Sequence, residues 1–347
     1  FAVVGLSIFG LLMVADASAV QAQSSFGDKF FYAKGQAVAL VVGIVGFLIS
    51  SFLPTNFWEK ITIPLFLGIL FFLVLVFIPG IGVDVLGAKR WINIGGFNFQ
   101  PAEPSKLVLI LYLSKLLSRG IKLVPFFVAS FLVFGLVVIE PDFGTAGIII
   151  ATSFTMFFVS GARLLIFSLL IPSLFVGGLS LVWFSGYRRE RLLTYLGEIK
   201  DPLNSSYHIS QVLIALSTGG LFGVGLGQSR AKYLFLPEAS TDSIFAVIGE
   251  ELGFIGAVAL ILIFVLIVVR MIRIALRSQD PFAKLSVFGI ASWITIQALV
   301  NMAAMTATIP ITGIPLPFIS YGGTALVVTL VASGIVLGIS RGQVVTR

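Results

Sequence analysis

Acidic side chains gather just before and within one apolar segment of this chain. The group consists of Glu238, Asp242, Glu250 and Glu251. Only 11% of the 347 residues are charged, so this concentration needs a physical reason. A carboxylate at the mouth of an apolar helix is favoured in its ionised form by the helix dipole and disfavoured by its apolar surroundings. Asp242 is therefore a candidate general base, and a simple N-terminal dipole partner is the alternative.

Glu250 and Glu251 lie deeper in the same segment. Pro237 ends what precedes it, so we predict one long helix through 243–270 with Asp242 on its first turn. Adjacent helix positions differ by about 100°, so the two glutamates cannot share a face. We expect one to point into the bundle and the other toward a loop or the headgroups. Charges at that depth mark functional sites by default, and a structural ion pair is the alternative.

A pair of opposite charges begins another apolar segment. Glu103 and Lys106 are three positions apart, so they lie on one face of the predicted helix. The pair can neutralise itself, or it can present Lys106 to an anionic phosphate. Just upstream, Lys89 and Arg90 stand beside Trp91, and arginine can grip phosphate through two hydrogen bonds. A simple interfacial anchor is the alternative for this basic and aromatic cluster.

Two further segments place polar residues near predicted helix ends. Asp142 follows Glu140 at one junction, where it can cap the next helix. The segment 306–323 contains Ser320 and is rich in proline and glycine, which predicts a rigid, non-helical path. Such a backbone at membrane depth is tolerated only where protein buries it or where it lines a cavity.

The elements that must position these groups are membrane spans. The chain is 58% hydrophobic and contains 33 Phe, and its apolar runs approach the ~20 residues that cross a bilayer. We predict an all-α, polytopic integral membrane protein, with residues 1–347 forming a single transmembrane domain of about ten helices. The predicted spans are 1–18, 36–52, 62–79, 103–118, 123–139, 145–160, 164–184, 243–270, 284–305 and 324–340.

Several kinds of chemistry are disfavoured by residues that are absent or rare. The chain has no cysteine, which excludes disulfides and thiol catalysis. Its single histidine, His208, argues against histidine-based metal sites and against a Ser-His-Asp triad. The net charge of +7 comes from basic residues scattered at span ends. It therefore indicates orientation and headgroup contacts, and not nucleic-acid binding.

Loop charges predict the orientation of the bundle. Basic residues concentrate in the short loops of one face, which the positive-inside rule places in the cytoplasm together with both termini. The opposite, extracytoplasmic face then carries three long loops, over 80–102, about 185–242 and 306–323. Loops of this length in a compact bundle usually carry function. We therefore expect the functional face to be extracytoplasmic.

Four stretches, taken in order, resemble the SEDS family (shape, elongation, division, sporulation; FtsW/RodA) of bacterial glycosyltransferases with ten spans. They are "GAKRWINIGGFNFQPAEPSK" (87–106), "EPDFGTA" (140–146), "GGLFGVGLGQSRAKYLFLPEASTDSIFAVIGEELGFIG" (219–256) and "TGIPLPFISYGG" (312–323). The likeness extends over essentially the whole chain. "GLGQSR" and "PEA" look more like the division branch, FtsW, than the elongation branch, RodA.

The resemblance implies a peptidoglycan glycosyltransferase that polymerises lipid II into β-1,4-linked glycan, with release of undecaprenyl pyrophosphate, in cell division. The family's essential loop aspartate falls on Asp242, and its helix-mouth acid and lysine fall on Glu103 and Lys106. The resulting hypothesis makes Asp242 the catalytic base. It assigns substrate or pyrophosphate binding to Lys106, Glu103, Arg90, Lys89, Glu238 and Ser320, with Asp142 and Glu250 in support.

The same resemblance implies a cofactor, partners and a location. A Mg²⁺ or Mn²⁺ ion held by pyrophosphate and a carboxylate, with Asp242 as the candidate, suits the oxygen ligands that such ions prefer. The implied partners are lipid II, polyprenyl-linked glycan, a class B penicillin-binding transpeptidase and other membrane proteins of division or elongation. The implied location is the bacterial cytoplasmic (inner) membrane, with the active site facing the periplasm.

Three other functions stay open at the level of sequence. A lipid II flippase would also use Glu250 or Glu251 and broken outer segments, but it needs a polar path that reaches both faces. The acids of this chain cluster on one face. An elongation polymerase of the RodA type has the same chemistry in another process. A catalytically silent scaffold would tolerate replacement of Asp242.

Overall fold

The computed structural model of the chain describes residues 1–163, 205–233 and 236–345 apart from 86, 87 and 96, and only scattered positions between 164 and 204. Its helices are α1 (Ala2–Phe26), α2 (Phe31–Phe52), α3 (Thr55–Leu75), α4 (Ala102–Ser118), α5 (Leu123–Ile139), α6 (Phe143–Val159), α9 (Ser205–Gly219), α10 (Ile244–Arg277), α11 (Pro281–Met305) and α12 (Gly323–Val345). Each predicted span coincides with one of these helices, except 164–184. That span and the first part of the predicted long loop, 185–204, lie outside the described residues.

Most of these helices can cross a bilayer. α1, α2, α3, α10, α11 and α12 are long and apolar enough to do so, and α5 and α6 are shorter apolar helices. Large apolar side chains on their surfaces are more than half exposed, for example Val41, Leu67 and Leu262. Lipid chains solvate such a surface, whereas water does not. The predicted all-α, multi-pass membrane architecture is confirmed.

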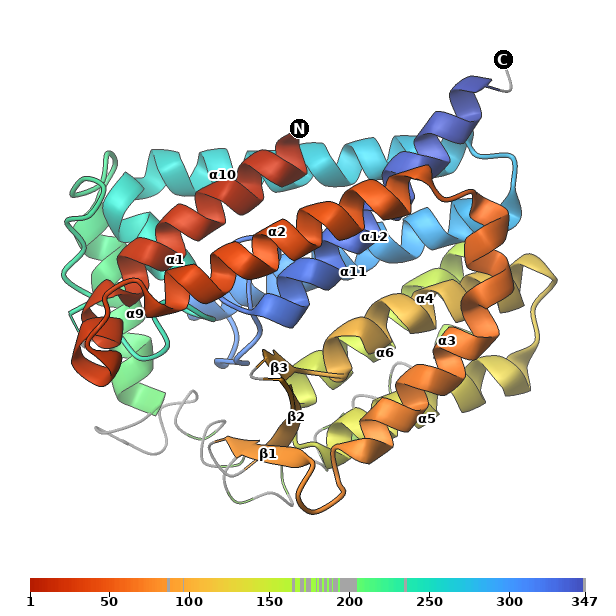
Figure 1. The fold of residues 1–347 in the computed structure, drawn as a ribbon, viewed down its shortest axis with the longest axis horizontal. Helices are drawn as coiled ribbons and strands as arrows, with labels where there is room; N and C mark the ends of the chain where they lie inside the picture. The colour runs from red at the N-terminus through yellow and green to blue at the C-terminus, as the bar shows by residue number, and fades with distance from the viewer. Residues whose placement is uncertain are drawn as a thin grey trace.

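Most of the long helices run in alternating directions, so their connections collect at two ends of the bundle (Figure 1). One end, here called the loop end, gathers 27–30, 76–101, 140–142, 220–243 and 306–322. Arg90 Nε donates a hydrogen bond there to the Glu140 carbonyl at 3.0 Å. The short connections 53–54, 119–122 and 278–280 lie at the opposite end. The described parts of the three predicted loops therefore share one side.

A small antiparallel sheet forms between α3 and α4, where the sequence predicted only a loop over 80–102. Strands β1 (Gly82–Val85), β2 (Ala88–Ile94) and β3 (Phe97–Phe99) pair in the order β1-β2-β3. Strands this short give too few alternating positions to stand out in a sequence pattern. The sheet matters for the site because β2 carries the predicted Lys89 and Arg90.

A helix also occupies part of the long segment predicted as a loop over 185–242. α9 packs against the first part of α10. The two backbones touch, since a Cβ added at Gly219 would lie 2.1 Å from the carbonyl oxygen of Gly249. α9 has 15 residues, which is too short to be recognised as a membrane span.

α10 is not continuous, contrary to the prediction, because its backbone breaks at Gly253. The φ of 69° and ψ of −170° at this residue are essentially restricted to glycine. The break leaves helical amides and carbonyls without their usual partners, and residues 220–225 bind them at 2.9 to 3.2 Å. The paired backbone groups belong to Val224–Glu250, Gly225–Glu251, Phe254–Gly220 and Ile255–Leu221.

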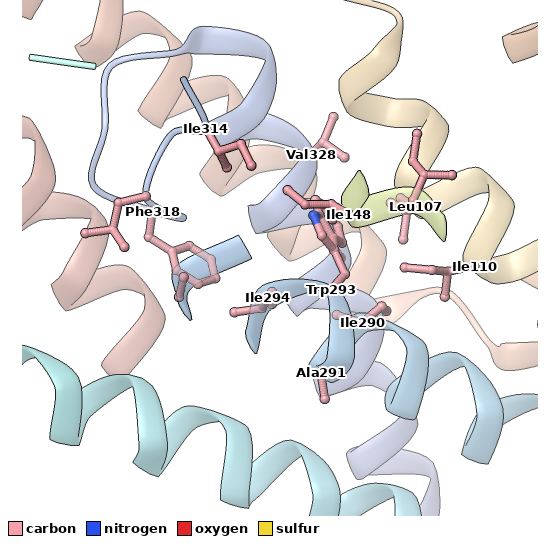
Figure 2. Close-up of a cluster of buried hydrophobic side chains, with 14 of the residues drawn as sticks. Leu107, Ile110, Ile148, Ile290, Ala291, Trp293, Ile294, Ile314, Phe318 and Val328 are labelled. Atoms are coloured by element: carbon pink, nitrogen blue, oxygen red, sulfur yellow. The ribbon is translucent and has the colours of Figure 1, made fainter. Parts of the chain in front are cut away.

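α11 is the central helix of the core. It packs against α4, α6 and α10, and its Trp293 is fully buried. Gly289 permits the close approach of α4, since an added Cβ there would lie 2.5 Å from Ile110 Cγ2. Figure 2 shows Trp293 among apolar side chains from other elements, including Leu107, Ile110, Ile148, Ile314, Phe318 and Val328. This position allows α11 to contact several candidate site residues at once.

Candidate functional site

Asp242 lies in the turn that leads into α10, and it is only 7% exposed. The helix begins after its N-cap residue, Ser243, so the prediction that Asp242 lies on the first turn is wrong. Its Oδ1 accepts a hydrogen bond from Thr241 Oγ1 at 3.3 Å. Its Oδ2 is near Gly313, where an added Cβ would lie 4.0 Å away. The carboxylate is therefore positioned between the α10 mouth and the 306–322 loop.

The 306–322 loop is tied to the turn that carries the aspartate. Ser320 Oγ donates to the Thr241 carbonyl and accepts from the Leu316 amide, the latter at 2.8 Å. The Tyr321 amide donates to the Ser240 carbonyl at 2.8 Å. The loop is non-helical, as predicted, and its second half is mostly buried, at Ile314 and over 316–320. Ser320 was predicted to bind substrate, and here its hydroxyl binds the backbone.

Glu103 and Lys106 form the predicted pair. Lys106 Nζ lies 2.9 Å from Glu103 Oε1, and the two side chains are 2% and 4% exposed. Nζ also donates to Gln297 Oε1 at 2.9 Å and lies 5.1 Å from the centre of the Trp293 ring. Buried charges are tolerated only when they are paired and further hydrogen-bonded. Lys106 meets both conditions, whereas Glu103 Oε2 is buried without a hydrogen-bond partner among the described residues.

Two amides of α11 connect this ion pair with the turn before α10, and sequence reasoning missed them. Gln297 Nε2 donates to the Pro315 carbonyl at 2.9 Å. Asn301 Nδ2 donates to the Asp242 carbonyl at 2.7 Å and to the Ile314 carbonyl at 2.8 Å. Positions four apart lie on one face of a helix, and amides are unusual in an apolar span. That spacing is the signal that could have revealed them.

The junction of α5 and α6 is bound to the small sheet. Asp142 is the N-cap residue of α6 and accepts from the amide and the hydroxyl of Thr145 at 3.0 and 2.9 Å. This confirms the predicted cap. Arg90 donates from Nε to the Glu140 carbonyl at 3.0 Å and from Nη2 to the Pro141 carbonyl at 2.7 Å. Arg90 therefore fixes β2 against this junction.

The Glu140 side chain is fully buried at the same junction. Among the described residues, neither of its carboxyl oxygens has a hydrogen-bond partner. Burial, helped by the negative charge of Asp142 and opposed by Arg90, raises the pKa of Glu140 to about 8. A carboxyl group in this environment is mostly neutral at pH 7.

Lys89 and Glu238 are the exposed members of the predicted site. Lys89 lies on β2, next to Arg90. Glu238 is four positions before Asp242, and its Oε2 accepts a hydrogen bond from Thr241 Oγ1 at 2.8 Å. Both residues belong to the loop end, where a ligand can reach them from outside the bundle.

Glu250 and Glu251 both accept hydrogen bonds from one loop, over 229–232, so the expectation that only one of them would face a loop is wrong. Glu250 accepts hydrogen bonds from Ser229 Oγ and from the Arg230 amide, the latter at 2.9 Å. Glu251 Oε1 accepts from the Ser229 amide at 3.1 Å and from Lys232 Nζ at 3.2 Å. Both carboxylates are buried. The contact with Lys232 agrees with the structural ion pair weighed as the alternative.

Lys232 extends this group to α1. Its Nζ contacts both carboxylate oxygens of Asp16, at 2.7 and 2.9 Å, and the Gly227 carbonyl at 2.7 Å. Burial acts to lower the pKa of Lys232, but its hydrogen bonds and charge interactions with Asp16 and Glu251 raise it above its ordinary value. The Lys232 cluster, defined as Lys232 with Asp16, Glu250 and Glu251, thus joins α1, α10 and the loop between α9 and α10.

The single histidine lies beside the same turn. His208 Nε2 of α9 is 2.8 Å from Ser243 Oγ. Ser243 Oγ has one hydrogen and donates it to the Pro237 carbonyl at 3.0 Å, so the histidine must be the donor to Ser243. His208 therefore supports the N-cap of α10.

The donor set does not match a metal site built by the protein. The described part of the chain contains no group of three or more His, Cys, Asp or Glu side chains that could hold a metal ion. Mg²⁺ and similar ions require about six oxygen ligands. Asp242 alone cannot supply them, so the described residues do not complete a metal site around it.

The family of this chain follows from its similarity to known proteins. The model of the FtsW/RodA/SpoVE family, described as "Cell cycle protein", matches residues 1–344. The chain belongs to this family. The resemblance seen in its four sequence stretches is thereby confirmed. The FtsW/RodA/SpoVE match includes the sheet, the α5–α6 junction, the 220–243 segment and the 306–322 loop.

Similar proteins span nearly the whole chain. The "Probable peptidoglycan glycosyltransferase FtsW" of Geobacter metallireducens is 40% identical, with 97% of this chain and 92% of that protein covered. "Stage V sporulation protein E" of Bacillus subtilis is 41% identical, with 97% and 94% covered.

Solved structures of the family share the fold. One reported as "Structural coordination of polymerization and crosslinking by a peptidoglycan synthase complex" has a TM-score of 0.77 at 29% identity, covering 98% of this chain and 97% of that chain. The rod shape determining protein RodA of Thermus thermophilus has a TM-score of 0.72 at 27% identity, covering 99% and 95%.

Proposed function

We propose that this FtsW/RodA/SpoVE family member is a peptidoglycan glycosyltransferase that polymerises lipid II during cell division. Relatives about 40% identical over nearly the full chain are named as probable peptidoglycan glycosyltransferases of the FtsW type. The observation that carries the proposal is the Asp242 carboxylate, buried at the loop end and positioned by backbone contacts. A general base needs such a fixed position.

In this reaction Asp242 accepts the proton of the 4-hydroxyl of the acceptor N-acetylglucosamine. The oxygen then attacks C1 of the donor sugar, and the bond from C1 to the lipid pyrophosphate breaks with its electron pair on the leaving group. Inversion at C1 gives the β-1,4 linkage. General-base assistance of this kind contributes about 10²–10⁴ in rate.

The leaving pyrophosphate carries several negative charges that cations must stabilise. Lys89 is exposed on β2 at the loop end, so its ammonium group is free to meet a phosphate directly. Lys106 and Arg90 already donate hydrogen bonds to protein acceptors. They therefore stabilise the negative charge of the leaving group by electrostatic attraction, and they could bind a phosphate directly only by giving up those acceptors. Glu103 holds the Lys106 side chain in place. Glu238 is exposed beside the same turn, and Ser320 holds the turn through its backbone.

The proposal extends to the surroundings of the enzyme. The loop end faces the periplasm, and the protein lies in the inner membrane. A solved relative of the same fold belongs to a peptidoglycan synthase complex, which supports a class B penicillin-binding transpeptidase as partner. A divalent cation, if one takes part, would take most of its ligands from the pyrophosphate, because the described residues offer no group of three or more acidic or histidine side chains that could hold it.

Lipid II polymerisation by the purified protein tests this function. We expect wild type, with its transpeptidase partner, to produce glycan polymer. Asp242→Asn keeps the size of the side chain and removes the base, so its rate should fall at least 100-fold with unchanged thermal stability. A folded Asp242→Asn protein with full activity would overturn the assignment.

The flippase alternative predicts a different outcome of the same experiment. In the described part of the chain, buried charged side chains gather toward the loop end, which supports a reaction at one face over a path through the bundle. A flippase would move labelled lipid II across vesicles without forming polymer. A scaffold would do neither, and cells would tolerate Asp242→Asn.

A further inference from the structure

α11 carries two buried amides one turn apart, and each binds the same short piece of the 306–322 loop. Gln297 donates to the Pro315 carbonyl and Asn301 donates to the neighbouring Ile314 carbonyl, at 2.9 and 2.8 Å. Both amide side chains belong to residues that are 1% exposed. A rigid helix thus holds two consecutive carbonyls of a non-helical loop.

The first amide also determines where the lysine ammonium lies. Gln297 Oε1 accepts hydrogen bonds from Lys106 Nζ at 2.9 Å and from Trp293 Nε1 at 2.7 Å. Neither donor can be satisfied by an NH₂ group, so the amide has only one suitable orientation. The lysine is therefore fixed relative to α11, independently of its pairing with Glu103.

The second amide determines where the aspartate backbone lies. Asn301 Nδ2 uses its two hydrogens for the carbonyls of Asp242 and Ile314. Its Oδ1 has no hydrogen-bond partner among the described residues, so the described hydrogen bonds of this side chain are those that its Nδ2 donates. A flipped amide would place oxygen against two carbonyl oxygens. The contact joins α11 directly to the residue proposed as the base.

We propose that Gln297 and Asn301 are positioning residues that set the distance between Lys106 and Asp242. This rests on the proposed function, in which the two side chains serve one reaction. A displacement of about 1 Å between reacting groups can lower a rate about 100-fold. Neither amide has to touch the substrate, and their effect passes through the lysine and the aspartate.

Four variants separate the two functions of each amide. Gln297→Leu removes every contact, whereas Gln297→Glu keeps an oxygen for Lys106 and loses the donor to Pro315. Asn301→Leu removes both donors, and Asn301→Asp sets a carboxylate against two carbonyls. We expect both Leu variants to lower kcat about 10- to 100-fold with less than a threefold change in KM. Gln297→Glu should recover part of the loss, and Asn301→Asp should lose at least as much as Asn301→Leu.

Gln36→Leu provides the matched control. Gln36 is also a buried amide that binds this loop, through the Ser320 carbonyl and the Gly322 amide, each at 3.1 Å, but it contacts neither Lys106 nor Asp242. Its kcat should fall much less than that of Asn301→Leu at equal thermal stability. An equal fall in kcat would show that general loosening of the loop explains the effect, and the proposal would fail.

A distance measurement provides a readout that does not depend on activity. The chain has no cysteine, so spin labels on Glu238→Cys and Arg119→Cys would report the position of the aspartate turn relative to α4. We expect one narrow distance distribution in the parent and a shifted or broadened one with Asn301→Leu. An unchanged distribution together with unchanged kcat would refute the positioning role even if Asp242→Asn is inactive. An active Asp242→Asn would instead refute the proposed function.

Discussion

Two ion pairs of nearly equal length lie at opposite ends of the molecule. At the loop end, Lys106 and Glu103 are 2.9 Å apart with side chains 2% and 4% exposed. At the opposite end, Arg119 and Glu59 are 2.8 Å apart with side chains 65% and 30% exposed. Water screens the second pair and leaves it weak, whereas the first depends entirely on protein partners.

The difference in exposure between the two ion pairs indicates different roles for the two ends of the bundle. An exposed pair can be lost at little cost, so it suits a surface that only has to meet water and headgroups. A buried pair is rarely more stabilising than apolar side chains of the same size. The presence of such a pair at the loop end therefore suits a use of the charge itself. The following predictions test this contrast, from the largest expected effect to the smallest.

Lys106→Met should have the largest effect. It leaves Glu103 buried without its cation, which costs about 3–5 kcal/mol of unfolding free energy. Thermal unfolding in detergent, followed by tryptophan fluorescence, measures the loss. The double variant Glu103→Met with Lys106→Met should regain most of the stability and still fail to polymerise lipid II. Activity in the double variant would mean that the charge has no function.

Lys232→Met should destabilise the protein less, by about 2–3 kcal/mol. It removes the cation from Asp16 and Glu251, but the Asp16 side chain is 28% exposed, so water compensates part of the loss. The same unfolding assay applies. Arg230→Met is the control, because this neighbour is exposed and bonds through its backbone amide. Equal losses in both variants would argue against the Lys232 cluster.

Glu140→Gln should change the pH dependence of stability. The pKa of Glu140 is raised from 4.5 to about 8, so the folded state holds the proton more tightly than the unfolded state between these values. Stability should therefore fall as pH rises through this window, by at most about 1.4 kcal/mol per pH unit. Unfolding measured at about pH 6.5 and about pH 7.5 should show a smaller difference in Glu140→Gln. An identical slope would mean that Glu140 is ionised in both states.

Arg119→Ala should have the smallest effect, below about 1 kcal/mol. The exposed pair with Glu59 should also lose its contribution as salt is added. Unfolding at low and high salt measures this. A loss comparable to that of Lys106→Met would erase the contrast between the two ends.

Local contacts were predictable from the sequence. The Glu103–Lys106 pair and the Asp142 cap each depend on a spacing of three positions within or beside one helix. The irregular 306–322 loop follows from its prolines and glycines. In each case the physical cause is contained in a few consecutive residues.

Contacts between distant segments were not predictable in the same way. The break at Gly253 lies in a segment whose pattern predicts one continuous helix, and it depends on residues 220–225 to bind its free backbone groups. The hydrogen bonds that Glu250 and Glu251 accept come from one loop, over 229–232. The contact of Asn301 with Asp242 joins residues 59 positions apart. No single-helix pattern contains that information.

The broken α10 also constrains the order in which the chain can assemble. Its unpaired carbonyls and amides around Gly253 would meet hydrocarbon without donors or acceptors, unless residues 220–225 are already in place. Gly223 and Gly253 make this fit possible, because an added Cβ at either would collide with backbone atoms of the other segment. We therefore expect the kinked helix to insert and residues 220–225 to dock on it in one step of biogenesis. The turn that carries Asp242 lies between these two segments, so it can take its final shape only after that step.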